Sequence, residues 1–132
     1  LPILDWGRSK GQVRVARSNV DLVNTQAEQG MKDFELNVCK MVRQFNLQRQ
    51  YVQVAAKADR TADRRYEVAK RLYILGKSTI LDLNSATTEK DSARRNYISA
   101  LRTYWSLYYG LRSMTGYDYE KNQKIAENYP EI

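Results

Sequence analysis

The chain has 132 residues, which suits one domain, and carries 22 Lys and Arg against 15 Asp and Glu. It contains no His, the commonest general base and transition-metal ligand, and Cys39 is its only thiol. The sequence therefore predicts no enzyme activity, no bound metal and no cofactor. The formal net charge of +7 suggests an anionic partner. However, basic residues are spread along the chain and alternate with acids even in the densest stretch, residues 60–71, so we expect no nucleic-acid binding.

Long helices are expected because the two prolines, Pro2 and Pro130, lie at the ends of the chain. Between residues 13 and 73 the apolar side chains recur at alternating steps of three and four residues, which is typical of a packed helix. One irregularity, two four-residue steps in succession at residues 23–31, predicts a local unwinding of a supercoil without a break. We expect a first helix over about residues 8–75, with Asp5 as its N-cap.

The segment after this helix interrupts the pattern. Gly76 is suited to the left-handed conformation that ends a helix, and either Ser78 or Thr79 can cap the next helix. Apolar residues then recur again by threes and fours, which predicts a second helix over about residues 80–115. The predicted fold is all-α: a long, coiled-coil-like antiparallel helical hairpin with its tip at residues 76–79.

The two predicted helices differ in length, and this leaves part of the first without a partner. In a hairpin that turns at residues 77 and 78, residue i faces residue 155 − i, which pairs Ala55 with Ala100 and Met41 with Met114. Residues 8 to about 38 then have no partner, yet each large apolar side chain left in water there costs about 1.5 kcal/mol or more. Their stripe consists of Val13, Val20, Val23, Ala27 and Met31. We expect another chain, or the remainder of this one, to cover it, and the isolated chain to self-associate.

Second apolar stripes accompany both helices. They comprise Ile98, Leu101, Trp105 and Tyr108 on the second helix, and Val15, Leu22 and Leu36 on the first. Each helix is therefore expected to have more than one neighbour. On the main seam of the second helix, Lys90 is expected to snorkel or to set the register, and the tyrosines are expected to pack.

Two segments resemble the second repeat of the TolC-like outer-membrane channel proteins. The start of the chain, PILDWGR at residues 2–8, is similar to the family's Pro-hydrophobic-Phe/Leu-Asp-x-Gly-Arg segment, where a barrel strand leads into the long helix. Residues 73–86, YILGKSTILDLNSA, are similar to the family's Tyr-x-x-Gly-x-x-Ser/Thr-hydrophobic-hydrophobic-Asp-hydrophobic-x-x-Ala. The order of these segments and the helix lengths also agree, and the resemblance covers about residues 1–118.

The resemblance implies a trimer that spans the outer membrane as a barrel and continues through the periplasm as a hollow helical tube. Such channels serve drug-efflux pumps and type I secretion. Residues 1–7 would be the exit from a barrel strand, residues 8–116 one hairpin of the tube, and residues 117–132 a tail that begins the equatorial region. The implied partners are two further copies, a periplasmic adaptor protein and, indirectly, an inner-membrane transporter.

The same resemblance assigns roles to residues at the tip. The family's tip loops meet the adaptor, and the positions that inherit this contact are Leu75, Gly76, Lys77, Ser78 and Thr79. Asp82 matches a carboxylate that lines the closed pore entrance in some members, although an acid in the first turn of a helix has a simpler explanation. Those members hold a second acid where this chain has Ser85 and a basic residue where it has Ser78, so their salt-bridge latch is not expected here.

Two functions of other classes remain open. A basic helical rod could lie on an anionic membrane, but this needs Lys and Arg on one face, whereas here they flank acids. A cytoplasmic coiled-coil scaffold would explain the heptads, but not the start at residues 2–8 or the unpaired half of the first helix. No apolar run reaches the roughly 18 to 20 residues of a membrane-spanning helix. The start also has neither an initiator Met nor a signal-peptide pattern, so we expect a piece of a longer protein.

Overall fold

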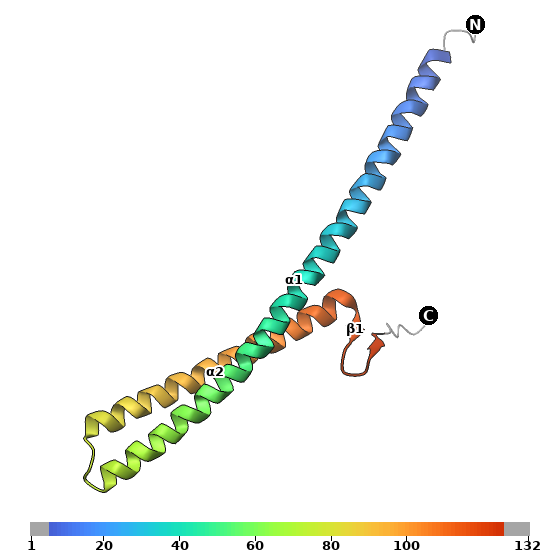
Figure 1. Cartoon of the computed structure of the whole chain (residues 1–132). Helices are drawn as coiled ribbons and strands as arrows, with labels where there is room; N and C mark the ends of the chain where they lie inside the picture. The colour runs from blue at the N-terminus through green and yellow to red at the C-terminus, as the bar shows by residue number, and fades with distance from the viewer. Residues whose placement is uncertain (1–5, 126–132) are drawn as a thin grey trace, which may run out of the picture. The chain divides into compact units, whose positions relative to one another are not determined.

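The computed structural model describes residues 6–125, which form two helices followed by two short strands. Helix α1 spans Trp6–Ile74 and helix α2 spans Ile80–Thr115. Figure 1 shows α2 returning antiparallel beside the later part of α1, which confirms the predicted all-α hairpin. The first helix begins two residues before the predicted boundary and ends one residue before it. The predicted N-cap, Asp5, lies outside the described residues.

The chain divides into two units, Leu1–Cys39 and Lys40–Ile132. α1 runs through both units and passes the irregular steps at residues 23–31 without interruption, as predicted. Within the first unit, the described side chains before Val38 are all exposed. The apolar stripe is among them, with Val20 58% and Met31 68% exposed, so this unit leaves its apolar side chains uncovered.

Towards the tip, the core of the second unit consists of small side chains, whereas Tyr108 and Leu111 of α2 are buried at the far end. Ala55 and Ala62 of α1 and Ala100 of α2 are buried, and they belong to alanine heptads at residues 55, 62 and 69 and at residues 86, 93 and 100. Because the distance between two packed helices depends on the side chains at their contact, alanine on both sides favours a close approach. The core is therefore thin, and large apolar side chains remain on the flanks of the hairpin.

Larger side chains pack between the helices at the far end of the hairpin. The ring of Phe45 in α1 lies 5.0 Å from that of Tyr104 and 6.3 Å from that of Tyr108, measured between centroids. Met41 packs against Gly110, because its Sδ lies 3.6 Å from the position that a Cβ of Gly110 would occupy. Gly110 leaves room for the thioether, and it lies one helical turn before Met114, the residue predicted to face Met41.

A short two-stranded β-hairpin, which we call the clasp, follows α2, and the sequence pattern did not predict it. Strands β1, Tyr117–Asp118, and β2, Gln123–Lys124, pair antiparallel. The Asp118 carboxylate is buried, accepts hydrogen bonds from the N–H groups of Lys121 and Glu120, and lies 3.0 Å from a guanidinium nitrogen of Arg112. These contacts, the Lys121 N–H foremost, hold the pKa of Asp118 below its ordinary value. Strands of two residues are too short to show an alternating pattern in the sequence.

Candidate functional site: the tip of the hairpin

The turn between α1 and α2 is built from backbone hydrogen bonds around Gly76. This residue has φ +67°, which confirms the predicted left-handed conformation. Its N–H donates to the carbonyl of Tyr73 at 2.9 Å, and the N–H of Lys77 donates to the carbonyl of Leu72 at 2.9 Å. This pair of bonds is the Schellman arrangement, which satisfies carbonyls that the end of a helix would otherwise leave unpaired. The local sequence thus stops α1 and reverses the chain within five residues, 75–79.

The start of α2 is closed by a capping box. The Thr79 hydroxyl accepts from the N–H of Asp82 at 3.2 Å, and Oδ2 of Asp82 accepts from the N–H of Thr79 at 3.1 Å. The same carboxylate oxygen also accepts from the hydroxyls of Thr79, at 2.7 Å, and Ser78, at 3.1 Å. Thr79 is therefore the N-cap of the two candidates, and Ser78 reinforces it.

These contacts affect the chemistry of the Asp82 carboxylate. The Thr79 hydroxyl, the Thr79 backbone N–H and the Ser78 hydroxyl, in that order, lower the pKa of Asp82. The residue is thus held ionised at the first turn of α2, where the helix dipole also favours a negative charge. This arrangement accounts for Asp82 at the helix start, while its expected place at a pore entrance stays a prediction.

Large aliphatic side chains surround the turn. Ile74 is 72%, Leu75 66%, Ile80 54% and Leu81 74% exposed, and we call these four residues the tip apolar cluster. Of the four, only Leu75 was among the predicted contact residues. The sequence contained a signal for the other three, because each lies next to the predicted turn. Both helices end at this turn, so no other part of the hairpin can cover these side chains. Exposed apolar surface of this kind marks sites of interaction.

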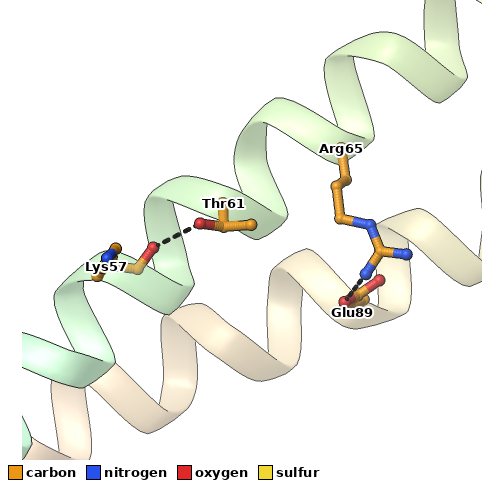
Figure 2. Close-up of polar contacts among 4 residues, drawn as sticks. All are labelled: Lys57, Thr61, Arg65 and Glu89. Atoms are coloured by element: carbon orange, nitrogen blue, oxygen red, sulfur yellow. Dashed lines mark hydrogen bonds and ion pairs between the residues drawn. The ribbon is translucent and has the colours of Figure 1, made fainter.

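Ion pairs between the helices support the tip. Figure 2 shows Arg65 of α1 reaching Glu89 of α2, with Nη1 2.6 Å from Oε1. Further from the tip, the Lys90 ammonium lies 3.0 Å from the Asp63 carboxylate and 4.3 Å from the centroid of the Tyr66 ring. The hydrogen bond with Asp63 is the main cause that raises the pKa of Lys90. Lys90 therefore pairs across the two helices, in agreement with its predicted role in register.

A groove lies beside the tip, between α1 and α2. It encloses about 600 Å³, and we call it the flank groove. Its lining residues are Thr61, Arg64, Arg65, Val68, Ala69, Leu72, Lys77, Ser78 and Asp82. Two of the predicted tip residues, Lys77 and Ser78, thus belong to the wall of this groove, together with Asp82.

Within residues 6–125, no helix is long and apolar enough to cross a membrane, and no three His, Cys, Asp or Glu side chains gather as a metal site would require. What the described residues do present is a helical hairpin with apolar side chains exposed at its tip and on its flanks. Such a hairpin belongs to the class of structural and interaction elements that complete a larger assembly.

The comparison with known families identifies the assembly. Residues 1–117 match the family described as outer membrane efflux protein, and the chain belongs to this family. It is therefore a component of an outer-membrane efflux channel, from a family of channel and transport proteins. The predicted resemblance to TolC-like proteins is confirmed, and the match favours the channel over a cytoplasmic scaffold. No curated protein and no solved structure matches the chain significantly.

Proposed function

We propose that the chain supplies one hairpin of the periplasmic tunnel wall in a trimeric channel, and that the tip of this hairpin binds the adaptor of a tripartite efflux pump or type I secretion system. The observation that carries the proposal is the tip apolar cluster. Its four aliphatic side chains are more than half exposed around a turn that is held by a Schellman arrangement and a capping box. A rigid turn with exposed aliphatic side chains is suited to binding another protein.

The flanks of the hairpin support the role in a wall. Exposed apolar residues lie on both helices of the second unit: Leu47, Tyr51, Val54 and Val68 on α1, and Ile98, Trp105 and Tyr109 on α2. In addition, the first unit exposes its own apolar stripe. A helix in the wall of a closed tube packs between two neighbours, so it needs apolar side chains on more than the side facing its hairpin partner.

Within this proposal, the tip residues divide into two groups. Leu75 and Lys77 present side chains to the adaptor, whereas Gly76, Ser78 and Thr79 shape the turn through backbone and hydroxyl hydrogen bonds. The Asp82 carboxylate lines the pore entrance, and the three copies in the trimer place three negative charges there. A ring of like charges in a narrow passage selects for cations.

Photo-crosslinking in the full-length channel tests the proposed contact. A photoreactive residue replaces Leu75 or Leu81, one at a time, in cells that contain the adaptor. Cys39 is exposed and is first replaced by Ser, so that thiol reactions do not contribute. We expect adaptor adducts from both tip positions and none from Arg60, which lies on the α1 surface away from the tip. Adducts from Arg60 with none from the tip would overturn the proposal.

A further inference from the structure

The half of the hairpin away from the tip contains no acidic residue on either helix. We call it the far half, and it consists of residues 40–58 of α1 and residues 92–115 of α2. Each of these two segments holds four basic residues and no Asp or Glu. The even spread of basic residues along the chain therefore hides an uneven spread of acids, and the far half is strongly positive.

Most of these basic side chains have no carboxylate beside them. Arg94 pairs with Asp59, and Arg112 pairs with Asp118, at the two borders of the far half. The other six form no ion pair among the described residues: Lys40, Arg43, Arg49, Lys57, Arg95 and Arg102. All six are exposed, so their charges are available to an anionic partner.

Two aromatic rings of α2 form an exposed apolar surface in the far half, which we call the aromatic platform. Trp105 and Tyr109 are four residues apart and therefore lie on the same face of the helix. Their ring centroids are 6.1 Å apart, their planes are inclined by only 31°, and they are 44% and 56% exposed. Edge contacts with Tyr104 and Tyr108, at 82° and 83°, hold the indole ring in this orientation. The platform is therefore broad, flat and fixed before any ligand binds.

One of the unpaired cations lies beside the aromatic platform. Arg102 is three residues before Trp105 and seven before Tyr109, so it shares their face of α2. A guanidinium is a planar fork that suits a carboxylate with two parallel hydrogen bonds. This face thus combines a flat apolar surface with a cation about one helical turn away.

The shape and the charge of this surface indicate the chemistry of its ligand. The faces of aromatic rings are negative, so they attract the polarised C–H groups on the face of a sugar ring. The Tyr109 hydroxyl both donates and accepts, as the hydroxyls of a sugar require. The guanidinium of Arg102 adds a preference for a carboxylate. A carboxylate-bearing glycan combines these three features, whereas an apolar helix on this face would leave Arg102 unpaired.

We propose that the far half binds a carboxylate-bearing glycan strand of the cell wall, with one sugar ring stacked on the aromatic platform and a carboxylate on Arg102. The other unpaired cations attract the strand at longer range. This inference rests on the periplasmic location in the proposed function and goes beyond the adaptor contact. It requires the platform to stay accessible in the assembled channel, which leaves Ile98 and the flank of α1 to neighbouring helices of the wall.

Soluble oligosaccharides test the ligand. The probe is a fluorescently labelled oligosaccharide of alternating N-acetylglucosamine and N-acetylmuramic acid, which carries carboxylates. Its matched control is a chito-oligosaccharide of equal length, which carries none. Both are titrated against the full-length channel in nanodiscs by fluorescence anisotropy. We expect the acidic oligosaccharide to bind about threefold more tightly at low ionic strength and the advantage to fade at high salt. Equal affinities, or no binding of either, would overturn the inference.

Variants of the channel locate the binding surface. Trp105→Leu and, separately, Tyr109→Leu keep apolar bulk but remove a flat ring, so each should weaken the binding of both oligosaccharides about fivefold. Arg102→Gln should remove only the preference for the acidic one. The matched controls are Tyr51→Leu, at an aromatic residue that is 54% exposed on α1, and Arg60→Gln, at an exposed arginine outside the far half. Both controls should bind as the unmodified channel does.

Two results would identify another occupant. Unchanged affinity in both Trp105→Leu and Tyr109→Leu, in assembled channels, would mean that a neighbouring helix covers the aromatic platform. A single-stranded oligodeoxythymidine that binds as tightly as the acidic oligosaccharide, with the same dependence on Trp105, would mean that any polyanion with rings suffices. Either result would overturn the glycan as the ligand.

The outcome is separable from that of the proposed function. Adaptor adducts from Leu75, together with glycan binding that does not depend on the aromatic platform, would keep the tip contact and overturn this inference. No adducts from Leu75, together with platform-dependent binding of the acidic oligosaccharide, would overturn the adaptor contact and support the glycan.

Discussion

The Nε of Arg94 lies 3.0 Å from Oδ1 of Asp59, yet this carboxylate oxygen is buried and accepts no hydrogen bond among the described residues. The pair is unequal, because the Asp59 side chain is 8% exposed and that of Arg94 is 54% exposed. Burial therefore removes most of the hydration of the Asp59 carboxylate, and its one ion pair is with an arginine that water still screens. The attraction between the two charges offsets only part of the free energy that the lost hydration costs.

This asymmetry predicts that replacing the two partners changes the free energy of unfolding by unequal amounts. Arg94→Ala should lower the free energy of unfolding by about 1–3 kcal/mol, because it leaves a buried carboxylate without its cation. Asp59→Ala should change it by less than about 1 kcal/mol, because it removes the buried charge and adds a small side chain between Ala55 and Ala62. Urea denaturation followed by circular dichroism measures both. Arg95→Ala, at an exposed position, is the control; a larger loss for Asp59→Ala than for Arg94→Ala would contradict the prediction.

Gly76 should be sensitive to a β-branched side chain for conformational reasons alone. A Cβ at this position meets no atom within 4 Å, so the effect of Gly76→Val arises from its φ of +67°. The strain should amount to about 1 kcal/mol or more and should displace the tip apolar cluster. We expect drug resistance to fall before the full-length protein loses stability, whereas Gly76→Asn, which tolerates this conformation better, should have a smaller effect. Normal assembly and wild-type drug resistance in Gly76→Val would argue against a role of the tip in efflux.

The proposed pore role of Asp82 predicts a change in ion selectivity. Asp82→Asn removes three charges from the proposed trimer and should reduce the preference for cations, measured as a shift in single-channel reversal potential. Thr79→Ala is the matched control, because it breaks the capping box but keeps the carboxylate. A shift in the control alone, or in neither variant, would leave Asp82 with its role at the helix start.

The clasp after α2 should weaken in acid. The folded-state pKa of Asp118 lies below its ordinary value of 3.8, so the stabilisation is present above that value and is lost as the pH falls through the folded-state pKa. Asp118→Asn should therefore have a lower urea midpoint than the unmodified chain at neutral pH. This difference should shrink as the pH falls through the folded-state pKa of Asp118, where the native carboxyl also gains a proton. A constant difference across the pH range would show that charge on Asp118 is unimportant.

The first unit should drive self-association of the isolated chain. Val20 and Val23 are 58% and 61% exposed, and burial in a second copy is a direct way to remove them from water. Sedimentation equilibrium at about tens of micromolar should reveal dimers or larger species, and Val20→Glu with Val23→Glu should reduce them. Circular dichroism should report that the second unit stays helical. A compact monomer of the unmodified chain would refute this prediction.

The two helices and the tip could be predicted because their signals are local. Gly76 ends α1 because glycine adopts the left-handed conformation without strain, and Thr79 and Asp82 are three residues apart, within one turn of α2. The heptad pattern of small and apolar residues predicts that the two helices pack as a hairpin. Each of these features involves residues that the covalent chain already holds close together.

Contacts between segments that are distant along the chain could not be predicted from patterns in one sequence. Nothing in the sequence distinguishes Arg64 from its neighbour Arg65, yet only Arg65 faces Glu89 on the other helix. Likewise, the packing of Met41 against Gly110 joins residues that are distant along the chain. By itself the sequence determined the helices, their turn and the family. The tertiary structure alone decided which charges are paired and where the flank groove lies, because these depend on how each helix is rotated about its axis and how far its side chains reach.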